Sequence, residues 1–354
     1  MFPSPIRVMI PRFMWQTVSP DATGSLIWPT AFFDAVFRAP NGWSIRDYWS
    51  RVTFGLLDLR FDLANLWWLL EREQSSLRDD RGGMIAACRA AAEENDYSLA
   101  GYDRVVCFVN PPPCNAGAIG APGDVVLDQG GSLEMFQHEI GHLLGFEHVW
   151  GRNGVYEDPY CVMGYTGLWA HDIARPPEFA RLTTIATDFW RSGRRVAAAS
   201  LYRLFVRPEF GGSGALDSGQ GAAGFFDPHV AHVRTGEAVW LTALSESSGA
   251  EPVLAVMPIP EGGVLAVEYR NNTGDDAGVP PAVVIQTIGA RSPGAGHHEV
   301  DPPWFEATVE PQAGASALVL NGTDLAGHPF GGHRVVVEQV ATASGVHRAL
   351  ISLH

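Results

Sequence analysis

Residues 137–150, QHEIGHLLGFEHVW, hold three histidines, two glutamates and two glycines among large apolar side chains. His138 and His142 are four residues apart, so a helix would place both imidazoles on one face, with their Cβ atoms roughly 6 Å apart. Gly145 can end this helix in a left-handed turn, which would bring His148 back toward the same face. Three imidazoles and one open position are typical of a catalytic zinc site, whereas structural zinc sites have four protein ligands. The spacing therefore predicts one zinc ion bound by His138, His142 and His148.

Two glutamates lie next to these histidines in the sequence. Glu139 is placed to reach a metal-bound water rather than the metal itself, and a carboxylate there can act as a general base. Glu147 precedes His148 and is expected to be a solvated neighbour. The alternative for Glu147 is a hydrogen bond to a ligand imidazole.

The pattern H-E-x-x-H-x-x-G-x-x-H resembles the zinc helix of the metzincin clan of endopeptidases. The resemblance implies a Met-turn, and YEDPYCVMGYTG supplies Met163 as an apolar floor beneath the histidines, with Gly164 for a tight turn. This turn is similar to that of gametolysin-like and immune-inhibitor-A-like peptidases, and residues 32–61 and 265–289 resemble other segments of these families. His148 stands where immune-inhibitor-A-like enzymes tend to have Asp, which leaves the substrate preference open.

The resemblance also implies a role for Tyr165, two residues past Met163. Astacin-like and serralysin-like enzymes have a tyrosine at this position, which binds zinc and stabilises the oxyanion of the transition state. The alternative is that Tyr165 packs as a wall residue beside the substrate.

The expected secondary structure changes near Arg195. Before it, strands are expected in IRVMIPR, LLDLRFDL, DRVVCFVN and GDVVLDQG, and helices in SIRDYWSRV, GGMIAACRAAAEEN, SLEMFQHEIGHLLG and PPEFARLTTIATDFWRSG. After it, short β-rich runs beginning with LYRLFV recur between turn residues, which is typical of an all-β sandwich. We therefore expect an α+β (α/β) catalytic domain of metzincin type, with a mixed sheet and the zinc helix, at 1–195, and a β-sandwich at 196–354.

The four cysteines contain no C-x-x-C pair that would indicate a structural zinc or redox motif. Cys114 and Cys161 fall in expected loops at the edge of the cleft, and we expect a disulfide between them that pins the turn under the zinc. Cys88 and Cys107 lie in apolar contexts where free cysteine behaves as a small hydrophobic residue, and their pairing is left open.

Composition excludes several classes of function. The net charge of −15 argues against nucleic acid and anionic membrane surfaces as partners, and no apolar run is long enough to cross a bilayer. All 24 basic residues are Arg, so lysine-based Schiff-base and P-loop chemistry is excluded.

The N-terminal MFPSPIRVMIPRF has no signal-peptide core. The resemblance favours a secreted protein, and a cytoplasmic one is the alternative.

Two functions are consistent with these features. The first is a zinc endopeptidase that uses Glu139 to activate water against peptide bonds of a peptide or protein substrate. The second is a zinc hydrolase of the same fold that acts on a small peptide or a biosynthetic intermediate. The absence of a visible leader gives weight to the second, because an active protease is hazardous inside a cell.

Replacing Tyr165 with Phe tests the role that the resemblance implies. The change deletes only the hydroxyl, so loss of an oxyanion donor predicts a fall in kcat of roughly 10²- to 10³-fold with little change in KM. Steady-state kinetics on one peptide substrate would measure both constants. An unchanged kcat would make Tyr165 a scaffold residue.

Overall fold

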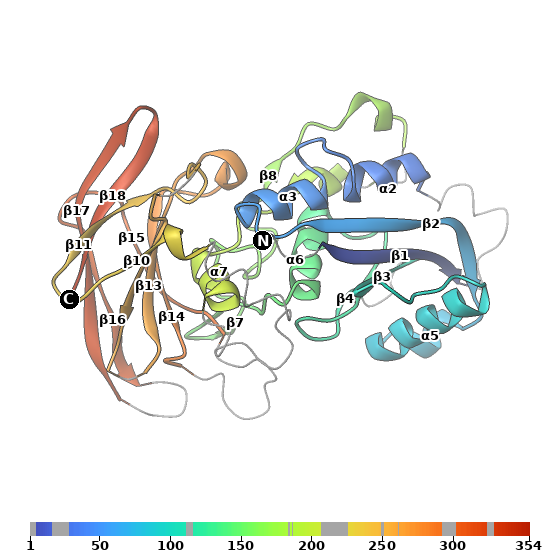
Figure 1. Cartoon of the computed structure of the whole chain (residues 1–354), viewed down its shortest axis with the longest axis horizontal. Helices are drawn as coiled ribbons and strands as arrows, with labels where there is room; N and C mark the ends of the chain where they lie inside the picture. Colours follow the sequence, from blue (N-terminus) through green and yellow to red (C-terminus); the bar gives the residue numbers. More distant parts are fainter. Residues whose placement is uncertain are drawn as a thin grey trace. The chain divides into compact units, whose positions relative to one another are not determined.

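A computed structural model describes residues 5–15, 28–110, 116–182, 185, 187–206, 226–248, 251–260, 262–291, 302–323 and 329–354 of this chain. It is a mixed α/β structure that divides into two compact units (Figure 1). The first unit comprises the described residues of Pro3–Gly145 and Asp172–Ser192, and the second comprises those of Phe146–His171 and Gly193–His354. The expected boundary at residue 195 lies beside Gly193, but the contacts also group residues 146–171 with the C-terminal part of the chain.

A five-stranded sheet organises the first unit, in the order β2-β1-β3-β5-β4. Its strands are β1 (Ile6–Trp15), β2 (Leu59–Leu70), β3 (Arg104–Asn110), β4 (Gly117–Ala118) and β5 (Val125–Leu127). Only the pair of β4 with β5 is antiparallel, so the expected mixed sheet is confirmed. Pro11 has no N–H for the ladder, and β1 accommodates it at a register shift between Ile10 and Arg12.

Helices cover both faces of this sheet. Side chains alternate along β3, so Cys107 packs in the core beneath α5 (Arg81–Glu94), whereas Phe108 packs in an aromatic cluster on the other face. Phe33 of α2 and Phe136 of α6 join that cluster, with ring centroids 4.8 and 6.2 Å from Phe108. The helices of this unit besides α5 are α2 (Thr30–Phe37), α3 (Ile45–Val52), α4 (Gln74–Leu77) and α6 (Leu133–Leu143). No helix in the described ranges has both the length and the hydrophobicity of a membrane span.

The second unit contains two sheets. The larger has the order β10-β12-β13-β14-β15-β6-β7, and the smaller has the order β11-β18-β17-β16. The strands of the larger are β6 (Trp150–Gly151), β7 (Gly154–Val155), β10 (Val230–His232), β12 (Leu254–Pro258), β13 (Val264–Arg270), β14 (Ala282–Ile288) and β15 (Trp304–Val309). Those of the smaller are β11 (Ala238–Thr242), β16 (Ser316–Thr323), β17 (Pro329–Ala343) and β18 (Val346–Leu353).

One hydrophobic core joins these two sheets. It includes Val267 and Ile285 from the larger sheet and Leu241, Val335 and Ile351 from the smaller, all fully buried. The sheets therefore pack face to face, as expected for a sandwich, and the hairpin β6–β7 adds two strands from the segment 146–171. A separate two-stranded sheet pairs β8 (His171–Asp172) with β9 (Arg191–Ser192).

Two expected elements are wrong. Residues 176–193 were expected to form one helix, but the described part has 3₁₀ turns at Pro177–Phe179 and Thr187–Trp190. The rings of Phe179 and Trp190 pack on the aromatic core of the first unit, and this tertiary packing outweighs helical propensity. The run LYRLFV was expected to be a strand, but it lies in α7 (Ala198–Phe205), every residue of which is buried. An apolar run of only six residues fits a buried strand as well as part of a buried helix, so its sequence does not distinguish the two.

A buried ion-pair cluster joins β13 to the beginning of α7. Arg270 Nε donates to Glu268 Oε1 at 2.7 Å, and its Nη1 donates to the two carboxylate oxygens of Asp276 at 2.9 and 3.0 Å. The other oxygen of Glu268 accepts the N–H of Ala198, and Asp276 Oδ1 accepts the N–H of Arg195 at 3.1 Å. The three charged side chains are at most 1% exposed. Their charges therefore fix where α7 begins relative to β13.

Replacing Arg270 with Met tests this cluster. The change removes the cation and leaves two buried carboxylates without a counter-charge, so we expect a loss of about 3–5 kcal/mol in the free energy of unfolding. Urea denaturation measures it. Arg348→Met is the matched control, because the side chains of Arg348 and its partner Glu251 are 36% and 43% exposed, and exposed pairs contribute about 1 kcal/mol or less. Equal losses in the two variants would contradict the role of the cluster.

Candidate metal centre

Helix α6 carries His138 and His142, and its formation follows from local sequence. The hydroxyl of Ser132 at the N-cap accepts a backbone N–H of the first turn at 3.2 Å. Its apolar side chains lie three or four positions apart and are fully buried: Leu133, Phe136, Ile140 and Leu143. His138 and His142 are also nearly buried, at 4% and 6% exposure. The expected helix and its N-cap are confirmed.

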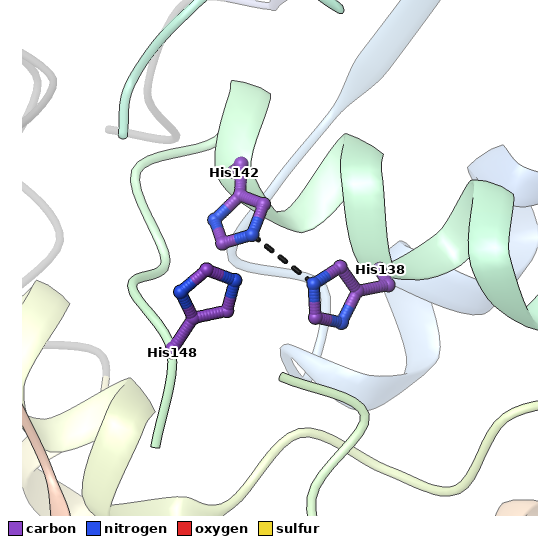
Figure 2. Close-up of side chains that lie close together, drawn as sticks. All are labelled: His138, His142 and His148. Atoms are coloured by element: carbon purple, nitrogen blue, oxygen red, sulfur yellow. Dashed lines mark hydrogen bonds between the residues drawn. The ribbon is translucent and has the colours of Figure 1, made fainter. Parts of the chain in front are cut away.

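The chain leaves α6 through Gly145, which has a φ of +98°. Its N–H donates to the carbonyl of His142 at 2.9 Å, and a side chain at this φ would be strained. The turn brings the ring of His148 to the two helical imidazoles (Figure 2). Candidate ligand atoms of the three histidines all lie within 4.8 Å of one another.

The donor set fits a metal ion such as zinc. The Nε2 atoms of His138 and His142 are 3.1 Å apart. Two imidazole nitrogens bound to zinc at 2.0–2.1 Å in a tetrahedral shell are roughly 3.3–3.4 Å apart, so this pair needs little adjustment. The full set, whose atoms lie within 4.8 Å of one another, would close further around an ion. Imidazole ligands suit zinc and also copper, iron and nickel. The structure thus brings the three predicted ligands together, and zinc as the bound ion stays a prediction.

The two glutamates of the motif have different surroundings. Glu139, next to His138 on α6, is partly exposed, as suits a group that exchanges protons with a substrate. Glu147 was expected to be solvated, and this expectation is wrong. Its side chain is 8% exposed, and its Oε2 accepts a bond from Arg203 Nη2 on α7 at 2.7 Å. Glu147 is buried because a cation 56 residues away in sequence provides its counter-charge.

The residue after His148 is held on both sides by main-chain hydrogen bonds. The N–H of Val149 donates to the carbonyl of Met163 at 3.2 Å, and the carbonyl of Val149 accepts the N–H of Tyr156 at 3.0 Å. Met163 is fully buried. The segment that contains Met163 therefore lies alongside the third histidine, whereas the position of the Met163 side chain beneath the imidazoles stays a prediction.

A tight turn follows at residues 161–164. The N–H of Gly164 donates to the carbonyl of Cys161 at 2.9 Å. A Cβ atom on Gly164 would lie 1.9 Å from the carbonyl oxygen of Asp158, so only glycine fits this close approach. The expected tight turn with Gly164 is confirmed.

Tyr165 is 57% exposed and its main chain is held firmly. Its N–H donates to the carbonyl of Asp158 at 3.3 Å, and its own carbonyl accepts a bond from the guanidinium of Arg194. Arg194 also donates to the carbonyl of Leu168 at 2.6 Å. These contacts fix the backbone, and a catalytic role of the Tyr165 hydroxyl stays a prediction.

Asp158 is completely buried beside this turn. Its Oδ1 accepts the N–H of Tyr160 at 2.7 Å, and its Oδ2 accepts a bond from the side-chain amide of Gln286 on β14. Burial raises the pKa of Asp158 to about 6, and the carboxylate of Glu268 adds to this effect. Gln286 Oε1 has no hydrogen-bond partner within the described part of the chain. A protonated Asp158 would donate to that oxygen once the amide turns over, which favours the neutral carboxyl.

Cys107 and Cys161 are free, buried thiols, and Cys88 is buried as well. Cys161 Sγ accepts the N–H of Ala197 at 3.2 Å. Burial, followed by the nearby Asp158, raises the pKa of Cys161 to about 12. Cys114 lies outside the described residues. The structure therefore has Cys161 unpaired, and its pairing with Cys114 stays a prediction.

Sequence reasoning missed Tyr156, Asp158, Arg203 and Gln286. For two of them a signal existed: Arg203 in LYRLFV and Gln286 in AVVIQTIG are polar residues inside apolar runs. Such residues need buried partners when the run is buried. The partners themselves cannot be named from the sequence, because they lie more than 50 residues away.

In comparisons with known proteins, the chain matches no protein-family model and has no significant match among curated proteins.

Replacing Asp158 with Asn tests the raised pKa. Between the ordinary value of 3.8 and about 6, the folded chain holds a proton on Asp158 that the unfolded chain has lost. The stability that this carboxyl contributes is therefore complete below about pH 4 and is lost as the pH rises through about 6. Asn mimics the neutral form at every pH.

The free energy of unfolding of Asp158→Asn minus that of the wild type should therefore increase between pH 4 and 7. A raised pKa of this size corresponds to on the order of 3 kcal/mol. Urea denaturation at four pH values in this range measures the difference. A difference that does not change with pH would contradict the raised pKa.

Proposed function

We propose that this chain is a zinc-dependent endopeptidase of metzincin type, with a metzincin catalytic domain at 1–195 and a β-sandwich domain at 196–354. The observation that carries the proposal is the convergence of His138, His142 and His148 beside Glu139. Its substrate is a peptide or protein.

Further features support this proposal. The motif resembles the metzincin zinc helix, and its glycine takes the left-handed conformation that returns the third histidine. The tight turn that contains Met163 is hydrogen-bonded to the residue after that histidine. The first unit has a mixed sheet with helices on both faces.

The residues have separate roles in the proposed reaction. His138, His142 and His148 would hold the ion through one ring nitrogen each. Bound zinc supplies a Lewis acid that lowers the pKa of water toward about 7 and polarises the scissile carbonyl. Glu139 takes the proton of the attacking water and delivers it to the leaving amine. Tyr165 is the candidate donor to the developing oxyanion.

Replacing Glu139 with Gln tests the mechanism. The base is lost while the three ligands remain, so casein hydrolysis should fall by about 10²- to 10⁴-fold. The zinc content should stay at one ion per chain. Glu93→Gln removes an exposed carboxylate on α5 and serves as the control with unchanged hydrolysis. Retention of most activity in Glu139→Gln would assign the base to another residue.

The same assay separates the two zinc hydrolases. Cleavage of casein that stops when a chelator removes the metal supports the endopeptidase. Zinc binding with hydrolysis of short peptides alone supports the enzyme of small peptides or biosynthetic intermediates. A wild-type chain that binds no zinc would overturn both.

A further inference from the structure

A short hairpin begins two residues after His148. Strands β6 and β7 pair Trp150 with Val155 and Gly151 with Gly154. The hairpin is anchored within its unit, because the N–H of Trp150 donates to the carbonyl of Pro303 at 2.9 Å and its ring stacks on Trp304 at 6.0 Å. The residue that follows this hairpin, Tyr156, is therefore delivered to a fixed place.

Tyr156 has an unusual backbone conformation. Its φ is +68°, the left-handed region that L side chains rarely adopt. Its N–H donates to the carbonyl of Val149, the residue next to His148. A non-glycine residue keeps such a conformation only when its surroundings hold it there, and such residues cluster at functional sites.

The side chain of Tyr156 packs on the third histidine. The ring centroids of Tyr156 and His148 are 4.3 Å apart, and the planes meet at 65°, which is an edge-to-face contact. Tyr156 is 40% exposed, so burial in a core does not account for its conformation. The backbone bond to Val149 and the ring contact with His148 are two interactions that hold it there.

His148 differs from the other two candidate ligands in what orients its ring. His138 and His142 are nearly buried on a helix that restricts their rotamers, whereas His148 is partly exposed on a segment without regular structure. A ring held by an aromatic neighbour loses less rotational freedom when it binds a ligand, because that freedom has already been lost.

We propose that Tyr156 is a positioning residue that fixes the imidazole plane of His148 toward His138 and His142. This inference rests on the proposed function, because it assumes that the three histidines bind zinc. Tyr156 acts through His148 and its hydroxyl is not required.

Two substitutions separate the ring from the backbone. Tyr156→Phe keeps the ring, and Tyr156→Asn removes the ring but tolerates the left-handed conformation. Zinc affinity of the full-length chain is measured by competition with a chromophoric chelator. Asn should weaken zinc binding by about 10-fold, the lower end of the effect of losing a group that orients a ligand. Phe should bind zinc as the wild type does.

Two further measurements distinguish positioning from a structural role. The melting temperature of the metal-free protein should change little in Tyr156→Asn, because the residue is partly exposed. The ring-proton NMR signals of His148, identified by their loss in His148→Gln, should show the ring-current shift of Tyr156 in the wild type and in Tyr156→Phe, and lose it in Tyr156→Asn. Ser344→Gly replaces another left-handed residue, with a φ of +53°, in the hairpin of β17 and β18, and should leave zinc affinity unchanged.

The outcomes are distinct. Wild-type zinc affinity in Tyr156→Asn would overturn the positioning role and leave the proposed function intact. Equal losses in Phe and Asn would assign the effect to the hydroxyl and would also overturn it. A wild-type chain that binds no zinc would overturn both proposals, and the NMR shift would then report the ring contact alone.

Discussion

The beginning of α7 in the second unit depends on a fully buried cation, Arg270. A guanidinium group does not lose its proton in a protein, so its burial requires carboxylates within reach. Glu268 and Asp276 provide them, and the same carboxylates accept the N–H groups of Ala198 and Arg195. Moving the beginning of α7 would leave buried charges or N–H groups unsatisfied. The charges of β13 and of Asp276 thereby determine the path of a segment 70 or more residues earlier in the chain.

Burial, and after it the neighbouring carboxylate of Glu268, raises the pKa of Asp158. Around the turn, carboxyl groups outnumber guanidinium groups. The carboxyl groups are those of Asp158, Glu268, Asp275 and Asp276, and the guanidinium groups are those of Arg194, Arg195 and Arg270. Arg194 donates to main-chain carbonyls, and the side-chain hydrogen bond of Asp158 comes from the neutral amide of Gln286. Burial and this neutral partner both favour the protonated form of Asp158. A neutral group at this point avoids a second buried negative charge next to Glu268.

The sequence predicts the parts of the candidate site that depend on local spacing. The positions of His138 and His142 follow from the helical period, and Gly145 and Gly164 mark turns that only glycine accommodates. Glu147 was misjudged because its partner Arg203 lies far away in sequence, on a helix that itself was expected to be a strand.

In the fold as well, elements set by local sequence patterns were predicted, and elements set by distant partners were missed. The strands β1, β3 and β5 and the helices α3, α5 and α6 were expected in place, because each has a clear period or a capping residue. The short strands β6 and β7 were not expected. The pairing of β6 with β7 and with β15 is a tertiary interaction that a two-residue segment does not reveal in the sequence. Tyr156 was missed for the same reason, since its importance comes from the hairpin that precedes it.

The three candidate ligands differ in the source of their rigidity, and this difference gives the β-sandwich a role. A helix holds His138 and His142 through its own backbone bonds, but the turn at Gly145 leaves His148 without such support. The supports of the segment that contains His148 lie within its own unit. They are the pair of Glu147 with Arg203, the bonds of Val149 to Met163 and Tyr156, and the stacking of Trp150 on Trp304.

Two of these supports, Arg203 and Trp304, lie in the C-terminal part of the chain, and Gln286 from the same part holds Asp158 beside the turn. An active site must hold its groups within about 0.5 Å of the productive geometry. A loop achieves this only when residues outside it fix its path. The sandwich therefore serves the proposed chemistry by holding the third ligand in place, a role that does not require it to touch the substrate.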